Sequence, residues 1–195
     1  TLINLGGFAN VTMKIKNNLI AYDICPINIV FNHLSRKLKL KYDDRGYIAS
    51  TGNLNEDLYD QLQKLSYFKK DPPKSLGIEW VINQIHPILN NFQNIAVKDL
   101  MNTFSNHFAF QIAKNIGDQS KVLITGGGAY NDYLIERIKN LTNSKITIPD
   151  PKIIEYKEAL IFSFLGLLRV LKINNCYSSV TGAKKNHCSG KIYNP

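Results

Sequence analysis

The first part of the chain alternates apolar and polar residues with a period of two. Residues 2–5, 9–15 and 19–22 therefore predict three strands, because successive side chains of a strand lie on opposite faces. Gly6-Gly7 separates the first two strands, and Asn17-Asn18 is a turn signal before the third. The pattern predicts an antiparallel meander with its turns at one edge.

From Pro26 the apolar period lengthens to that of a helix. Apolar residues that share one predicted helix face are Ile27, Val30, Phe31, Leu34 and Leu38. Further helices are predicted at residues 56–65, 77–88, 97–116, 131–141 and 155–172. The buried side of helix 97–116 is predicted to carry Leu100, Met101, Phe104, Phe108 and Ile112.

The most apolar stretch, residues 159–171, predicts a buried helix, because it contains Arg169 and is too short to cross a bilayer. Short apolar runs at 122–125 and 145–148 predict two more strands between helices. Strands that alternate with long helices indicate an α/β fold, and the initial meander favours a mixed sheet over a purely parallel one. Residues 71–75, with paired prolines, and the tail 178–195 are predicted to be irregular.

Composition supports a folded globular protein, with 44% hydrophobic and 20% charged residues among 195. Three cysteines without paired spacing and four scattered histidines favour neither disulfides nor a metal site, and indicate reduced thiols in the cytoplasm. The net charge is +9, but the lysines are dispersed apart from a cluster of basic residues at positions 36–41. A solvated face explains this cluster better than a nucleic-acid footprint, so neither nucleic acid nor membrane is a predicted partner.

Two glycine-rich turns are the first candidates for chemistry. Gly126-Gly127-Gly128 lies between a predicted strand and a predicted helix, where backbone N–H groups and a helix N-terminus favour an anionic ligand. Gly6-Gly7, followed by small and polar residues, can wrap around a phosphate chain. A plain turn explains each motif about as well when it is taken alone. Neither is a Walker element or a GxGxxG fingerprint.

Two carboxylates are further candidates. Asp23 ends an apolar strand beside a helix start, where it can accept a proton from an attacking water or hydroxyl, or simply cap the helix. Glu158 lies near the start of the most apolar helix, where it either complements the helix dipole or holds substrate hydroxyls.

Six segments, read in chain order, form a specific set. They are Asn4 to Thr12 (NLGGFANVT), Asp23 to Asn28, Pro72 to Ser75 with Gly77 and Glu79, Gly126 to Asn131, Glu158 to Leu160, and Ser179 to Ala183. This set is similar to the motifs of the anhydro-N-acetylmuramic acid kinase family, which belongs to the actin, hexokinase and heat-shock chaperone superfamily of ATPases. The resemblance covers nearly the whole chain and implies an actin-like ATPase domain of the ribonuclease H-like type, with a mixed five-stranded sheet flanked by helices.

The resemblance also implies roles for individual residues. Asp23 would be the catalytic base, and Glu158 would contact the sugar. ATP, with Mg²⁺, would be the cofactor. The residues implied in nucleotide binding are Gly6, Gly7 and Asn10 at the phosphates, and Gly126, Gly127, Gly128 and Asn131 at the adenosine.

The family reaction would couple two events at 1,6-anhydro-N-acetylmuramic acid, in the recycling of cell-wall peptidoglycan. Water opens the anhydro ring, and the freed 6-hydroxyl takes the γ-phosphoryl group to give N-acetylmuramic acid 6-phosphate. Many family members have Asp-Thr-Gly-Pro-Gly-Asn at positions 23–28, whereas this chain has bulky Ile24 and Ile27, which we expect to restrict the backbone's approach to a ligand.

The resemblance implies that residues 1–195 are the carboxy-terminal nucleotide- and sugar-binding domain of a two-domain kinase. The amino-terminal domain, with its first phosphate-binding loop, has no counterpart in this sequence, so we expect the chain alone to be inactive. A homodimer is possible. The alternative is a non-catalytic actin-like or chaperone-like nucleotide-binding module, for which the fold alone would suffice.

Overall fold

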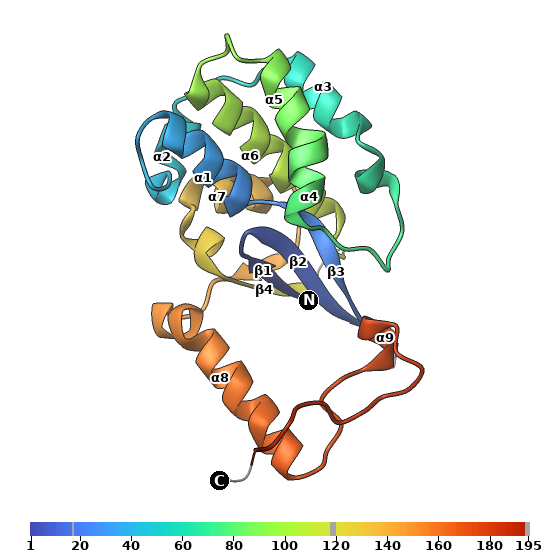
Figure 1. The fold of residues 1–195 in the computed structure, drawn as a ribbon. Helices are drawn as coiled ribbons and strands as arrows, with labels where there is room; N and C mark the ends of the chain where they lie inside the picture. Colours follow the sequence, from blue (N-terminus) through green and yellow to red (C-terminus); the bar gives the residue numbers. More distant parts are fainter. Residues whose placement is uncertain (17, 118–119, 194–195) are drawn as a thin grey trace.

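A computed structural model describes residues 1–16, 18–117 and 120–193 of the chain (Figure 1). Within them, five strands form one sheet in the order β3-β2-β1-β4-β5. Their bounds are β1 Leu2–Leu5, β2 Phe8–Ile15, β3 Asn18–Pro26, β4 Lys121–Thr125 and β5 Lys145–Thr147. The first three strands pair antiparallel, while β4 lies parallel to β1 and β5 parallel to β4. The predicted mixed sheet is confirmed.

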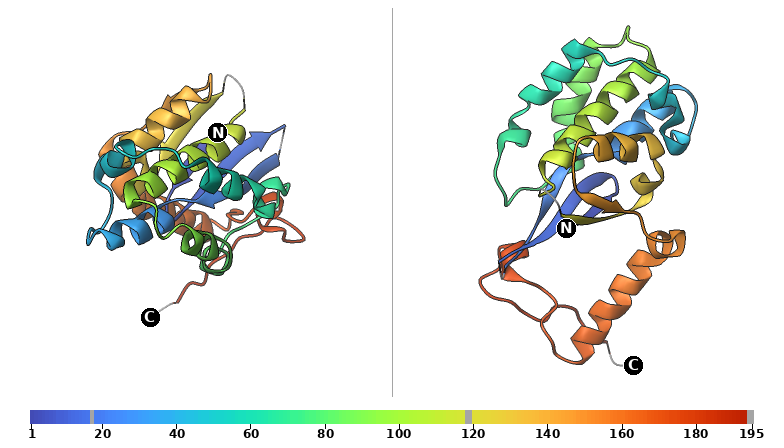
Figure 2. Two further views of the ribbon diagram at one scale, coloured as in Figure 1. Left: turned by 90° about the horizontal axis from the view of Figure 1, so that it is seen from above. Right: turned by 180° about the vertical axis from the view of Figure 1, so that it is seen from behind.

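Helices cover one face of this sheet, as the views of Figure 1 and Figure 2 show. Their bounds are α1 Asn28–Lys37, α2 Tyr47–Ser50, α3 Glu56–Lys64, α4 Ile78–Trp80, α5 His86–Asn91, α6 Val97–Lys114 and α7 Asp132–Asn140. A π-helical stretch, Val81–Ile85, joins α4 to α5, and short 3-10 turns lie at Asp44–Gly46, Ser66–Lys69 and Gly127–Tyr130. The main predicted helices are therefore present, although the one expected at 77–88 is interrupted.

The core lies between the sheet and α6. Alternate residues of β1 and β4, such as Ile3, Leu5 and Ile124, are fully or almost fully buried on this face. The five residues predicted to form the inner side of α6 are all buried as well: Leu100, Met101, Phe104, Phe108 and Ile112. Period-two strands and a period-3.6 helix thus bury their apolar sides against one another, which is how a two-layer α/β core forms.

Helix α8, Pro151–Val170, leaves the other side of the sheet and points away from it (Figure 1). Ile154 is its only buried residue, whereas Leu160, Phe162 and Phe164 are each more than half exposed. The prediction of a buried helix over residues 159–171 is therefore wrong for this chain. Apolar composition indicated burial, but the rest of the described chain provides no layer that covers this helix.

The chain then returns to the sheet through the tail, where a short helix α9, Ser178–Thr181, contacts β3. The rest of the tail up to residue 193 is irregular, as predicted. Asn17 of the predicted Asn17-Asn18 turn lies outside the described residues, and so do residues 194–195 of the tail. Among the described helices, none is long and apolar enough to cross a membrane.

Candidate functional site

A β-bulge sets the direction in which Asp23 points. Asn10 of β2 pairs with Asp23 of β3, but the neighbouring Ala9 pairs with Cys25, so Ile24 is an extra residue in β3. Cys25 is fully buried on the core face together with Ala9, whereas Asp23 faces the opposite side with Asn10. Without the bulge, residues 23 and 25 would share a face, because side chains alternate along a strand.

Groups on both sides of the paired prolines hold Asp23 in place. The Asp23 carboxylate Oδ2 accepts a hydrogen bond from the Leu76 N–H at 2.8 Å. The Asp23 N–H donates to the Lys74 carbonyl at 3.3 Å, and the Tyr67 hydroxyl donates to the Asp23 carbonyl at 2.6 Å. The carboxylate is thus oriented and half-buried, which suits a group that accepts a proton. The prediction that the strand ends at Asp23 is wrong, because β3 continues past the bulge to Pro26.

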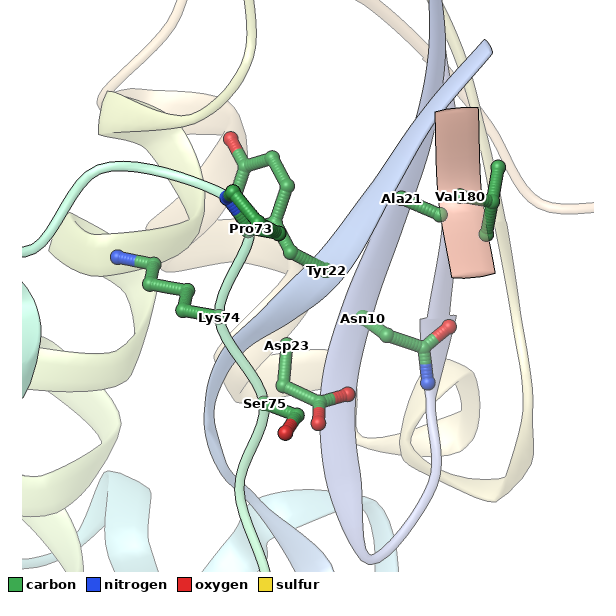
Figure 3. Close-up of a pocket in the computed structure, with 8 residues that line it drawn as sticks. All are labelled: Asn10, Ala21, Tyr22, Asp23, Pro73, Lys74, Ser75 and Val180. Atoms are coloured by element: carbon green, nitrogen blue, oxygen red, sulfur yellow. The ribbon is translucent and has the colours of Figure 1, made fainter. Parts of the chain in front are cut away.

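A cavity of about 490 Å³ opens beside this carboxylate (Figure 3). Its lining comes from three distant parts of the chain: Asn10, Ala21, Tyr22, Asp23, Pro73, Lys74, Ser75 and Val180. Asn10 and Asp23 both point into it, from neighbouring strands (Figure 3). The fold therefore brings together four of the sequence motifs here: the first hairpin, the β3 end, the Pro-Pro-Lys-Ser segment and the Ser-Val-Thr-Gly-Ala segment.

Lys74 lies at the rim of this cavity with its ammonium against two aromatic rings. Its Nζ is 5.0 Å from the centroid of the Tyr67 ring and 5.7 Å from that of Tyr22. Burial, and then the charge of Lys114, lower the pKa of Lys74 below its ordinary value. Burial, and then the charge of Asp23, raise the pKa of Tyr67, so its hydroxyl keeps its proton and remains a donor.

The Gly126–Gly128 turn packs against the end of β1, directly before the Gly6-Gly7 turn. At Gly126, which has a left-handed φ of 85°, an added Cβ would come within 2.7 Å of the Leu5 carbonyl oxygen. At Gly128 it would come within 2.7 Å of the Leu5 Cβ. Gly7 has nothing within 4 Å of such a Cβ, and Gly127 has only an Asn28 side-chain atom at 3.8 Å. Gly126 and Gly128 therefore allow close packing on β1, while Gly7 and Gly127 leave open space.

Asn28, at the start of α1, connects these turns. Its side-chain amide donates to the Leu5 carbonyl at 3.4 Å, and its Oδ1 lies 3.5 Å from the Cβ position of Gly128. The Asn28 N–H donates to the Gly6 carbonyl at 3.3 Å, and the Ile27 N–H donates to the Gly7 carbonyl at 2.8 Å. In the sequence, Asn28 belongs only to the Asp23–Asn28 motif and has no predicted role, although its place in the first turn of the predicted helix was a signal.

A second cavity, of about 420 Å³, lies beside the Gly126–Gly128 turn. Its lining is Asn28, Phe31, Asn32, Tyr42, Asp43, Asp44, Arg45, Gly127, Gly128, Tyr130 and Asn131. Of the predicted nucleotide ligands, it contains Gly127, Gly128 and Asn131. The Asn131 side chain caps α7 by accepting from the Leu134 N–H at 2.9 Å, so it also has a structural role. Tyr42 was not predicted, because residues 39–46 lack any regular pattern. Asn32 was not predicted either, because a polar residue within the predicted helix carried no signal of its own.

Glu158 lines neither of these two cavities. It is exposed on α8. Its neighbour Lys157 points to the sheet instead, where its ammonium donates to Asn4 Oδ1 and, at 3.2 Å, to Thr125 Oγ1. Burial lowers the pKa of Lys157. The predicted sugar contact of Glu158 stays a prediction.

The residues that depart from the family pattern after Asp23 face the core. Ile24, Cys25 and Ile27 are each at most 1% exposed. Burial raises the pKa of the Cys25 thiol well above its ordinary value, so it stays protonated. These bulky side chains therefore fill the interior and do not line either cavity.

The described residues contain no group of three or more His, Cys, Asp or Glu side chains that could hold a metal ion by themselves. A magnesium ion at this site would need ligands from a bound nucleotide, since Mg²⁺ is commonly held by one or two carboxylates and substrate phosphates. Asp23, with Oδ2 on the Leu76 amide, is the carboxylate of the first cavity.

Comparison with solved structures supports the fold. The activator of 2-hydroxyisocaproyl-CoA dehydratase from Clostridium difficile, solved with bound ADPNP, matches with a TM-score of 0.51 and 19% identity, over 90% of this chain and 64% of that one. At this identity the match concerns the fold alone. It supports the predicted fold, a mixed five-stranded sheet flanked by helices.

Comparison with known sequences identifies the family. A family model described as anhydro-N-acetylmuramic acid kinase matches residues 1–195. Relatives with that name from Francisella tularensis subsp. novicida and Clostridioides difficile are 32% and 33% identical, each over 98% of this chain and 54% of the relative. The chain thus spans about half the length of the curated relatives it matches. It belongs to the anhydro-N-acetylmuramic acid kinase family.

Proposed function

We propose that this chain forms the sugar- and nucleotide-binding wall of an ATP-dependent kinase that converts 1,6-anhydro-N-acetylmuramic acid to N-acetylmuramic acid 6-phosphate. The observation that carries the proposal is the oriented Asp23 carboxylate in a cavity that four family motifs line together. The family membership supports the substrate, and the fold supports ATP. Because the relatives are about twice as long, the complete site would need residues beyond these 195.

Asp23 would act as the general base. Its Oδ2 is occupied by the Leu76 amide, and the carboxylate faces the cavity, where a water could lie between it and the anhydro carbon. Asp23 would remove a proton from this water as the water attacks that carbon. As the new C–O bond to the water oxygen forms, the bond from that carbon to the bridging oxygen breaks. The freed oxygen, now on the 6-carbon and carrying the electron pair of the broken bond, attacks the γ-phosphorus, the bond from this phosphorus to the ADP oxygen breaks, and ADP leaves while Asp23 keeps the proton of the water. Positioned general bases contribute roughly 10²- to 10⁴-fold to rates.

The second cavity would hold the adenosine. Its Tyr42 and Tyr130 rings offer apolar faces for a base, and the carboxylate of Asp44 and the amide of Asn32 offer polar partners. The hairpin residues Gly6 and Gly7 would contact phosphates, as the open space at Gly7 permits. A Mg²⁺ ion bound with the nucleotide would neutralise phosphate charge.

The test uses a polypeptide in which the amino-terminal half of the Francisella relative is joined to these 195 residues. We expect ATP-dependent phosphorylation of 1,6-anhydro-N-acetylmuramic acid, and a loss of about 10²- to 10⁴-fold in kcat for Asp23→Asn. Asp60→Asn, at an exposed position of α3, is the matched control and should leave kcat unchanged.

The outcomes separate three readings. No turnover by the joined wild-type protein would refute the kinase proposal, and ATP binding without turnover would favour a non-catalytic nucleotide module. If Asp23→Asn retains the full rate, only the role of Asp23 as base is refuted.

For the isolated chain we expect weak ATP binding and no sugar phosphorylation. We also propose cytoplasmic residence, and the homodimer remains a prediction.

A further inference from the structure

One side of α8 carries a continuous row of large apolar side chains that face solvent. Successive members of the row are three or four residues apart, so they share one side of the helix. We call this row the α8 face; it consists of Ile153, Tyr156, Leu160, Phe164, Leu167 and, directly after the helix, Leu171. Each of these residues is between 49% and 66% exposed.

The helix touches the sheet only near its start. Ile154 is buried there, and Lys157 donates to Asn4 and Thr125. Further along, Arg169 contacts the tail through Cys188, and Gly166 has nothing within 4 Å of a Cβ position. The side of α8 that meets the rest of the described chain is thus a different side, and the α8 face is left uncovered. Large exposed apolar rows of this kind mark interaction sites.

Charge around the α8 face selects the kind of partner. The sequence has no Asp or Glu after Glu158. The basic residues of the same segment are Arg169, Lys172, Lys184, Lys185 and Lys191. A parallel contact with a second copy of this chain would bring these cations together, and like charges across an interface disfavour it. The surface that covers the second half of the α8 face should therefore be apolar at its centre and acidic at its rim.

The helix is also poorly suited to a membrane surface. Amphipathic helices that bind anionic lipid carry Lys and Arg along their polar side. In α8, Lys157 is engaged with the sheet and Arg169 with the tail. On one flank of the α8 face lie three small residues, Ala159, Ser163 and Gly166, which permit close approach of another polypeptide.

We propose that the α8 face is the docking surface for the polypeptide that makes up the other half of this kinase family. The chain spans 54% of its relatives, so about as much polypeptide again is present in those proteins and not in this structure. If the other half permanently covers these six residues, the apolar character of α8 is explained, although the helix lies outside the core of this domain. The proposal rests on the proposed function only for the identity of the partner.

The experiment mixes the 195-residue chain with the separately produced amino-terminal half of the Francisella relative and measures mass by sedimentation. A 1:1 complex is expected. Leu160→Glu with Phe164→Glu should weaken it at least tenfold. The matched control is Ile78→Glu with Ile82→Glu, two exposed apolar residues also four positions apart, in α4 and in the π-helical stretch that follows it, and it should not change the complex.

A second measurement uses the polypeptide that joins the two halves. The Leu160 and Phe164 pair should lower its melting temperature by several degrees and leave that of the isolated chain unchanged, because the two side chains are exposed there. The mass of the complex and the melting temperature are both measured without catalytic turnover. Failure of the kinase proposal is therefore distinguishable from failure of the docking proposal.

Four results would overturn the proposal. They are no complex with the wild-type chain, a complex that survives the Leu160 and Phe164 pair, self-association of the isolated chain that this pair abolishes, and binding to vesicles of anionic phospholipid that the pair abolishes. The third result would assign the α8 face to a second copy, and the fourth to a lipid surface.

Discussion

The three glycines at 126–128 meet different surroundings, although the sequence presents them as one motif. Gly126 and Gly128 adjoin the end of β1 so closely that a methyl group would collide with Leu5. Gly127 borders the second cavity without such a neighbour. A role in packing and a role in binding are therefore separable by substitution.

We expect Gly126→Ala to destabilise the protein by about 1–3 kcal/mol, because it combines a left-handed φ with a backbone clash. Gly127→Ala should change the free energy of unfolding by less than about 0.5 kcal/mol and weaken ATP binding. Urea denaturation and calorimetric titration measure the two effects. Equal destabilisation by both substitutions would contradict this assignment.

His107 makes a second residue-level prediction, which concerns pH. The ring is fully buried, its centroid lies 4.8 Å from that of Phe68, and burial lowers its pKa to about 3. In the unfolded chain the ring takes a proton below its ordinary pKa of about 6.5. The stability that neutral His107 contributes is therefore present above pH 6.5 and is lost as the pH falls from there towards 3.

Between pH 7 and pH 5 the wild-type protein should lose about 2 kcal/mol more than His107→Phe. Denaturant titrations of both proteins at the two pH values give this difference, in which the contributions of all other groups cancel. Parallel losses in the two proteins would show that His107 accepts a proton in the folded state.

At the scale of elements, the attachment of α8 depends on few contacts. Lys157→Met removes the ammonium that binds Asn4 and Thr125, while its length and apolar stem stay similar. We expect faster hydrogen exchange in the first half of α8 and a loss of stability of about 1 kcal/mol. Lys152→Met, at an exposed position of the same helix, serves as the control. Unchanged exchange in Lys157→Met would mean that Ile154 alone anchors the helix.

Periodicity predicted the elements that bury one side. The predictions of the inner residues of α6 and of the alternation in β1 and β4 were correct, because the local pattern and the tertiary burial agree there. The prediction that α8 is buried was wrong. An apolar composition indicates that a helix needs other residues packed over it, but it does not indicate which polypeptide provides them. The α8 face was visible as a pattern and needed the structure to show its exposure.

The candidate site was predictable only in part. Asp23 and the glycines stood out because a strand was predicted to end at Asp23 and because the glycines form turns, whereas Asn10 was implied by the family resemblance. Val180 was noted only as part of the Ser179–Ala183 motif and Tyr42 not at all, because their place in a cavity depends on how the tail and an irregular loop return to the sheet. The bulge at Ile24, which turns Asp23 to the cavity, leaves no signal in a single sequence.

For the molecule as a whole, the charge of +9 predicts little specific affinity for nucleic acid, because the cations are dispersed. At about 0.15 M salt we expect duplex DNA to bind with a Kd no tighter than about 10⁻⁶ M, the non-specific range. Fluorescence anisotropy with a labelled duplex measures this. Binding a hundredfold tighter, with a steep salt dependence, would require a nucleic-acid function in addition.

The segment that holds Asp23 has one more consequence. β3 is an edge strand, and the Asp23 N–H that it presents outward is taken up by the Lys74 carbonyl. Free strand edges recruit other chains and seed aggregation. The Pro-Pro-Lys-Ser segment therefore blocks edge-to-edge association at the same position where it orients Asp23. A substitution that loosened this segment would expose an aggregation-prone strand edge and would also displace the Asp23 carboxylate.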